Sequence, residues 1–187
     1  MFGQNGGFGL PQDSRLFLSG QERFFDRDEI IVSKTDLQGR IQYANRTFMR
    51  VGLFDEKELL GAPHSILRHP DMPRCVFKLL WDQITVGHEV FAYVLNRAKN
   101  GDHYWVFAHV TPCYDMSGQI VGYHSNRRVP NSQIVEQVIT PTYKDLLAIE
   151  AAKANAKDGM LSAYDHLLNL LKSKGLTYDQ FIFSLQS

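Results

Sequence analysis

The sequence lacks an excess of charge of either sign, because its 20 Lys and Arg residues balance its 20 Asp and Glu residues. A protein that binds nucleic acid needs a cluster of surplus basic residues, so this balance predicts that nucleic acid is not a partner. No stretch approaches the roughly 20 continuous apolar residues that span a bilayer. The N-terminal residues have neither the positive region nor the apolar region of a signal peptide. We therefore expect a soluble, cytoplasmic protein without direct membrane insertion.

Cysteine is also scarce, since Cys75 and Cys113 are the only two and do not suggest a disulfide framework. The seven histidines show no spacing typical of a zinc site, so we predict no metal. No glycine-rich phosphate loop, Ser-His-Asp order or paired-carboxylate signature stands out. These absences predict a protein that is not an enzyme. Aromatic residues, in contrast, make up 12% of the chain, which leaves room for a ligand pocket beside the core.

The hydrophobic pattern of the 187 residues predicts one α+β domain with an extension at each end. We interpret residues 1–28 as a flexible N-terminus and cap, with or without a short helix, residues 29–130 as the domain and residues 131–187 as a helical extension. Predicted strands cover residues 29–33, 40–44, 88–96, 103–114 and 119–127. Predicted helices cover residues 45–49, 55–60, 73–86, 142–156 and 158–174, and a capping box at 177–180 begins a last helix.

The predicted strand over residues 103–114 is apolar on both faces. One face carries Tyr104, Val106, Ala108 and Val110, and the other carries Trp105 and Phe107. A sheet with one solvated face alternates polar and apolar residues instead. We therefore expect both faces of the sheet to be covered, one by the short helices and a ligand, the other by a cap, a helix or a second subunit.

Three motifs are more specific than this order of elements. They are GAPHSILRHPDMP at residues 61–73, NRAKNGDHYWV at 96–106 and VTP at 110–112. With further matches from about Lys34 to about Leu147, they resemble the flavin-binding PAS domains of bacterial aerotaxis receptors. The resemblance implies the PAS fold, a five-stranded antiparallel sheet with short helices on one face, here with C-terminal helices added. It also implies that the cofactor is FAD.

The RHPDMP segment at residues 68–73 has two interpretations. Two prolines stiffen it, so that Arg68, His69 and Asp71 are presented just before a helix, and the Arg68 guanidinium suits phosphate oxygens or a ring. The alternative is an ordinary helix start with a solvated Arg–Asp pair. The resemblance favours the first, because the matching Arg, His and Asp are needed for FAD binding in the resembled domains.

Four further side chains complete the predicted flavin site. The amides of Asn45 and Asn96 suit the pyrimidine edge or ribityl hydroxyls of a flavin, although Asn45 also suits a helix cap and Asn96 a strand end. Trp81 either packs against the flavin or fills the core. Phe91 stands where the resembled domains have a pocket-lining tryptophan, and Tyr93 where they have a small residue.

Two alternatives to an FAD site have candidate residues in the sequence. Cys75 lacks the Asn-Cys-Arg-Phe surroundings of light-sensing flavin domains, so we interpret it as a buried structural cysteine. A haem-binding PAS domain uses an axial histidine, and His69 or His88 is the candidate for that role.

Together these features predict an FAD-binding PAS sensor of redox state or oxygen for energy taxis. In the resembled receptors a membrane anchor and a signalling region follow the PAS domain, whereas this chain ends after amphipathic helices. We therefore expect a free-standing homodimeric subunit that signals in trans to a membrane-bound chemoreceptor. Its C-terminal helices either dock on that receptor or a second subunit, or pack back on the sheet. The alternative functions are a PAS interaction adaptor without flavin and a haem-binding gas sensor.

Overall fold

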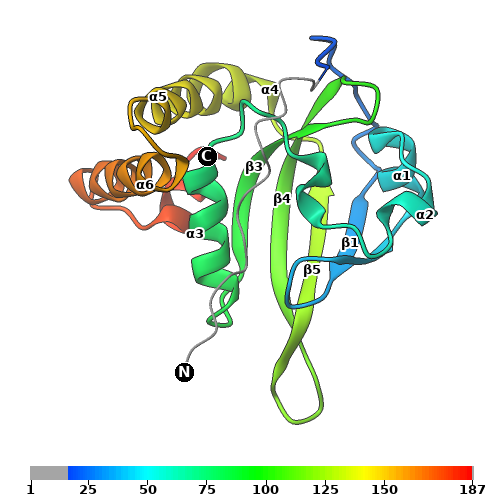
Figure 1. Ribbon diagram of the computed structural model, residues 1–187. Helices are drawn as coiled ribbons and strands as arrows, with labels where there is room; N and C mark the ends of the chain where they lie inside the picture. Colours follow the sequence, from blue (N-terminus) through cyan, green and yellow to red (C-terminus); the bar gives the residue numbers. More distant parts are fainter. Residues whose placement is uncertain (1–16, 187) are drawn as a thin grey trace.

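Five antiparallel strands form one sheet in the order β2-β1-β5-β4-β3 in the computed structural model of this chain, which describes residues 17–186 (Figure 1). The strands are β1 (Ile31–Thr35), β2 (Ile41–Ala44), β3 (Val90–Arg97), β4 (His103–Tyr114) and β5 (Ile120–Arg128). The five-stranded antiparallel sheet of the predicted α+β fold is therefore confirmed. Pairing of Ala108 with both Ala92 and Arg127 places β4 between β3 and β5.

Short helices lie on one face of this sheet, which we name the inner face. They are α1 (Arg46–Gly52), α2 (Glu56–Leu59), the 3-10 helix η1 (His64–Leu67) and α3 (Arg74–Ile84). The inner face carries the buried side chains of Tyr104, Val106, Ala108 and Val110, as the alternation in β4 predicts. Phe48 of α1 is buried in the core that these helices form with the sheet.

The C-terminal residues are helical from Ser132 onward, earlier than the predicted start at residue 142. The helices are α4 (Ser132–Ile134), the π-helix η2 (Val135–Ile139), α5 (Thr140–Ala151), α6 (Ala156–Ser173) and α7 (Tyr178–Ser184). Gly159 lies against the backbone of Glu150, so α5 and α6 approach more closely than a side chain at residue 159 would permit. The predicted capping box is present, with Thr177 and Gln180 bonding each other's backbone N–H.

Two of these C-terminal helices, α5 and α7, pack back on the opposite face of the sheet, which we name the outer face, while α6 packs against α5 and α3. The ring of Tyr143 lies 6.0 Å from that of Trp105, and Phe183 lies 4.9 Å from Phe91. Figure 1 shows α5 and α6 beside α3 at the β3 side of the sheet, with α1 and α2 at the β1 side. Of the two arrangements that the sequence left open, packing on the sheet is the one this structure shows.

The cap runs beside the turn between β3 and β4. Glu22 forms a bridge with His103, and Arg23 makes an ion pair of 3.3 Å with Asp102. Residues 17–28 contain no helix, while residues 1–16, where flexibility was expected, lie outside the described part of the chain. Within residues 17–186, no helix combines the length and the apolar character needed to cross a bilayer.

Candidate functional site

The inner face carries a buried polar cluster centred on Arg127, because alternate residues of β1, β4 and β5 point to the same side of the sheet. The Arg127 Nη2 atom donates a hydrogen bond of 2.9 Å to the Ser33 hydroxyl and lies 2.6 Å from the His64 Nε2 atom. Its guanidinium carbon lies 5.4 Å from the centre of the Phe48 ring. The cluster therefore joins β1, β5, η1 and α1 on the face that the short helices cover.

Several groups on this face are buried without a hydrogen-bond partner among the described residues. They are the Asn96 Nδ2, Tyr104 hydroxyl, Ser125 Oγ and Arg127 Nη1 atoms. A buried polar group without a partner costs about 1–3 kcal/mol, so native proteins rarely keep several together unless a ligand or water satisfies them. The inner face is thus supplied with donors and hydroxyls that the protein itself does not use.

Burial also controls the charges of this cluster. It raises the pKa of Tyr104 to about 12 and lowers the pKa of Arg127 to about 10, so the hydroxyl stays neutral and the guanidinium charged at neutral pH. Burial and the nearby Arg127 charge lower the pKa of His64 to about 3. His64 is therefore neutral, and its Nε2 atom accepts the hydrogen bond that Arg127 donates.

The RHPDMP loop lies next to Asn96, because the backbone of Arg68 forms an isolated bridge with that residue. The Arg68 Nη2 atom donates 3.3 Å to the Met72 carbonyl, and its guanidinium lies 5.0 Å from the centre of the Phe77 ring. Among the described residues no carboxylate pairs with Arg68, so the Arg–Asp pair of the alternative interpretation does not form.

The other two loop residues face different surroundings. His69 is buried, with its ring 5.8 Å from that of His103, and its Nδ1 atom accepts a 3.1 Å hydrogen bond from the Asp71 N–H. The Asp71 side chain is 73% exposed and therefore free to meet a ligand or solvent. The loop and Asn96 are the part of the predicted site that the structure brings together.

Asn45 and Trp81 lie where the structural alternatives place them. The Asn45 Oδ1 atom accepts from the N–H groups of Phe48 and Val32, and its Nδ2 atom donates to the Ile30 carbonyl, so its amide caps α1. Trp81 is half-buried, with its ring edge-on to that of Tyr123 at 5.4 Å.

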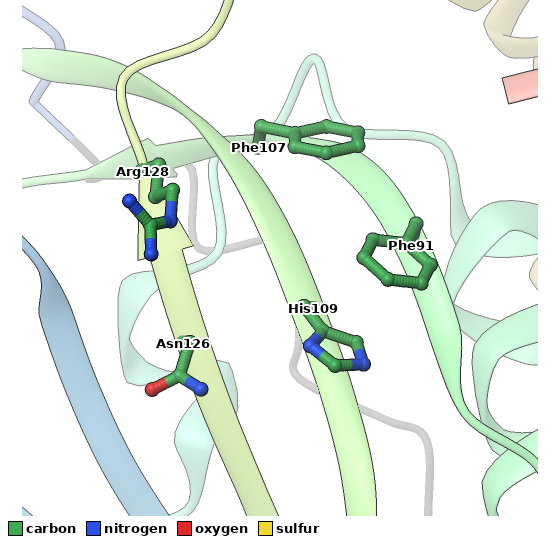
Figure 2. A pocket seen from close by; sticks show the side chains of 5 residues that line it. All are labelled: Phe91, Phe107, His109, Asn126 and Arg128. Atoms are coloured by element: carbon green, nitrogen blue, oxygen red, sulfur yellow. The ribbon is translucent and has the colours of Figure 1, made fainter. Parts of the chain in front are cut away.

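Phe91 lies on the outer face, across the sheet from Asn96. Its ring stacks on His109 at 4.1 Å, in a pocket of about 150 Å³ that Phe107, Asn126 and Arg128 also line (Figure 2). As Figure 2 shows, these side chains come from β3, β4 and β5. The structure thus separates Phe91 from the inner-face groups with which the sequence grouped it.

The residues considered for a light-sensing flavin site or a haem site lie away from the inner-face cluster or have other partners. Cys75 is buried, as interpreted from the sequence, and burial together with the nearby Glu150 raises the pKa of its thiol to about 12. His88 is exposed two residues before β3, with its Nδ1 atom 3.0 Å from the Gln83 side chain. No group of three or more His, Cys, Asp or Glu residues in the described range is arranged to bind a metal ion.

Four residues of the inner-face cluster were not predicted from the sequence, namely Ser33, His64, Ser125 and Arg127. The signal for the last two was the alternation of Tyr123, Ser125 and Arg127 along the last strand, which puts polar side chains on one face. Without the register of β5 against β4, that face was not identifiable as the inner one.

The pattern of the PAS fold family matches residues 30–125. The aerotaxis receptor of Escherichia coli is 42% identical over 141 residues, which are 75% of this chain and 27% of the receptor. The nitrogen fixation regulatory protein of Klebsiella pneumoniae is 24% identical over 103 residues, or 55% of this chain and 21% of that protein. The chain therefore spans about a quarter of the length of these relatives.

Solved structures show the same fold at lower identity. The light-state structure of the blue-light photoreceptor Aureochrome1 LOV superposes with a TM-score of 0.53 at 24% identity, covering 59% of this chain and 89% of that one. A light-oxygen-voltage domain studied with a flavin analogue has a TM-score of 0.53 at 17% identity, covering 62% and 87%. At these identities the likeness establishes the arrangement of the sheet and helices.

Proposed function

The chain belongs to the PAS family, and on that premise we propose that it is a non-enzymatic sensor that binds FAD and responds to redox state or oxygen. The observation that supports this proposal most is the set of unpartnered buried groups on the inner face. A flavin ring has carbonyl and nitrogen acceptors at one edge and hydroxyls on its side chain, which match amide, guanidinium and hydroxyl groups. The 42% identity to an aerotaxis receptor also supports a flavin as the cofactor of this chain.

The residues proposed to hold the cofactor fall into two groups. The sheet residues with unpartnered atoms on the inner face would bind the polar edge of the ring. They are Asn96, Tyr104, Ser125 and Arg127. Arg68, His69 and Asp71 would bind the remainder of the FAD from the loop beside Asn96, as the resemblance implies. Asn45 and Trp81 would act indirectly, through the cap of α1 and the packing of α3.

Bound flavin supplies the capacity to accept and release electrons, while the protein supplies binding and electrostatics. Reduction changes the charge and protonation at the ring edge, and the groups on β3, β4 and β5 would respond through their hydrogen bonds. Those same strands carry Phe91, His109 and Asn126 on the outer face (Figure 2). We expect the change to reach this outer surface, where a partner that binds the two states differently would read it.

The partners are proposed to be a second copy of this chain and a membrane-bound chemoreceptor in trans. The support is the outer face over β5 and β1, where Lys34 and Arg128 are exposed and His124 and Asn126 half-exposed. If the protein stays monomeric at high concentration with the cofactor both oxidised and reduced, the dimer is wrong.

The absorption spectrum of the purified protein tests the cofactor. The two visible and near-ultraviolet bands of oxidised flavin are expected, and the mass of the cofactor released by heating distinguishes FAD from FMN. A Soret band would instead support the haem sensor, and a colourless protein that takes up no added flavin would support the adaptor.

Substitution in the loop tests the site. Arg68→Ala and Asp71→Ala should each lower flavin occupancy, while Arg46→Ala on the exposed surface of α1 is the matched control. Full occupancy in both loop variants would contradict the assignment of the loop. Circular dichroism of each variant separates lost binding from lost folding.

A further inference from the structure

Arg127 is the one buried Lys or Arg side chain within residues 17–186, at 4% exposure. Among those residues no carboxylate lies within ion-pair distance of it. Removing a guanidinium from water without an opposite charge is strongly unfavourable, and natural proteins pair such groups almost without exception. A charge buried in this way indicates that a negatively charged or electron-rich group from outside the protein completes the site.

The protein holds one side of the guanidinium and leaves the other side free. Ser33 from β1 and His64 from η1 both contact the Nη2 atom, and the Phe48 ring of α1 lies beneath the guanidinium. The Nη1 atom is buried and has no partner. From β4, Tyr104 is the nearby titratable group. The groups facing Arg127 are therefore neutral, and none of them balances its charge.

We propose that Arg127 binds the electron-rich edge of the reduced flavin ring and thereby favours the reduced cofactor, with one negative charge, over the oxidised one. The inference rests on the proposed function. Two electrons from a reductant and one proton from solvent convert the neutral oxidised ring into a reduced ring with one negative charge. Arg127 then supplies both the opposite charge and an N–H donor, whereas the neutral oxidised ring receives only the hydrogen bond.

The wild-type protein provides the first test, which needs no substitution. Its midpoint potential is measured by dithionite titration against a reference dye from pH 6 to pH 8. Uptake of one proton with two electrons should lower the potential by about 30 mV per pH unit, the value of a tenfold change for a two-electron couple. A slope of about 60 mV per pH unit would mean that a second proton neutralises the ring, and would overturn the inference.

Arg127→Gln and Arg127→Lys provide the second test. Gln should lower the preference for the reduced cofactor at least tenfold, which is about 30 mV in midpoint potential, while Lys should retain most of it. The matched control is Arg46→Gln, on the exposed surface of α1, which should leave the potential unchanged.

A Gln variant that binds flavin with the wild-type potential would overturn the inference and leave the proposed function standing. If the Gln variant retains no flavin or does not fold, two other measurements test the inference. They are the slope of the wild-type potential with pH and the midpoint potential of the Lys variant. A wild-type protein that takes up no flavin would overturn the proposed function, and the inference with it.

Discussion

The two faces of the same sheet satisfy their polar groups differently. On the outer face, the Tyr143 hydroxyl donates 2.6 Å to the Tyr93 carbonyl, and the Gln186 side chain donates 2.5 Å to the Tyr93 hydroxyl. On the inner face, the Tyr104 hydroxyl and the Arg127 Nη1 atom are buried without partners. The Arg97 Nε atom is the one outer-face exception within the described residues.

This difference indicates that the outer face stabilises the fold and that the inner face is available to a ligand. Where the protein supplies its own partners, the contacts hold the C-terminal helices in place and contribute to stability. Where it leaves donors free, the groups are available for a ligand, at a cost in stability of the unliganded protein. Substitutions in the self-satisfied packing and in the unsatisfied inner face, each with a control, can therefore break or sharpen the comparison.

Leu167→Ala should lower the free energy of unfolding by about 3 kcal/mol, because Leu167 is 3% exposed in the core where α6 packs against α5 and α3. Urea denaturation of the flavin-free protein measures the loss. Its neighbour Leu168 is 41% exposed, so Leu168→Ala should cost about 0.5 kcal/mol or less. Equal effects of the two substitutions would contradict packing of the extension on the domain.

On the inner face, His64→Gln should alter the dependence of stability on pH. The pKa of His64 is about 3 in the folded protein, below its usual 6.5, so the unfolded chain binds the proton first. Stability from this group is complete above pH 6.5 and is lost as the pH falls toward 3. At pH 5.5 the loss relative to pH 8 is about 1.4 kcal/mol in free energy of unfolding.

Urea denaturation of the flavin-free protein at pH 8 and pH 5.5 measures this loss for each variant. His64→Gln should be less sensitive to acid by that amount, since glutamine accepts from Arg127 without titrating. His166→Gln, on the exposed side of α6, is the control and should keep the wild-type sensitivity. Identical profiles for His64→Gln and the wild type would show that His64 is not held neutral.

Tyr143→Phe and Tyr104→Phe compare the two faces with the same chemical change. The first removes a hydrogen bond that is made and should cost about 1 kcal/mol in the flavin-free protein. The second removes a hydroxyl without a partner and should leave stability unchanged or raise it, yet weaken flavin retention. Chemical denaturation measures the stability of each variant, and the rate of flavin dissociation measures retention. If Tyr104→Phe destabilises the flavin-free protein, the inner-face hydroxyl has a partner after all and the difference between the faces does not hold.

Tyr164→Phe should have the smallest effect, about 0.5 kcal/mol or less, because Asp82 keeps its ion pair with Lys78. The Tyr164 hydroxyl donates 2.8 Å to that carboxylate at the partly exposed junction of α6 and α3. Tyr43→Phe, at an exposed position in β2, is the control in thermal unfolding. A loss of well above 1 kcal/mol in the free energy of unfolding would show that the Tyr164–Asp82 hydrogen bond contributes as much as a buried one.

Much of the fold was predictable because local signals and packing agree. The strand predicted over residues 103–114 has the same bounds in the structure, since its apolar alternation fits a sheet buried on both faces. Gly175 has a φ of +66° after α6, as expected for the residue that ends a helix. The extension over residues 131–187 was predicted to be helical, but no individual helix was predicted before residue 142, because the segment from Ser132 is short and includes a π-helical turn.

The candidate site was predictable only in part. The loop at Arg68 and the strand end at Asn96 lie together as the motifs predicted, because a backbone bridge joins them. Asn45 caps α1 through its Oδ1 atom, a role that the same residue type also indicated, and its Nδ2 atom donates to the Ile30 carbonyl. Arg127 was missed because arginine in a strand is usually exposed, and only the pairing of β5 with β1 and β4 buries it.

The sequence by itself determined the order of strands and helices and the inward or outward alternation within each strand. Those properties depend on neighbours along the chain, through backbone sterics and the two-residue period of a strand. The tertiary structure alone decided which face each strand turns to the helices, and where the C-terminal helices lie. Strand register and helix docking join residues far apart in sequence, so they bring Ser33, His64 and Arg127 together where no local pattern does.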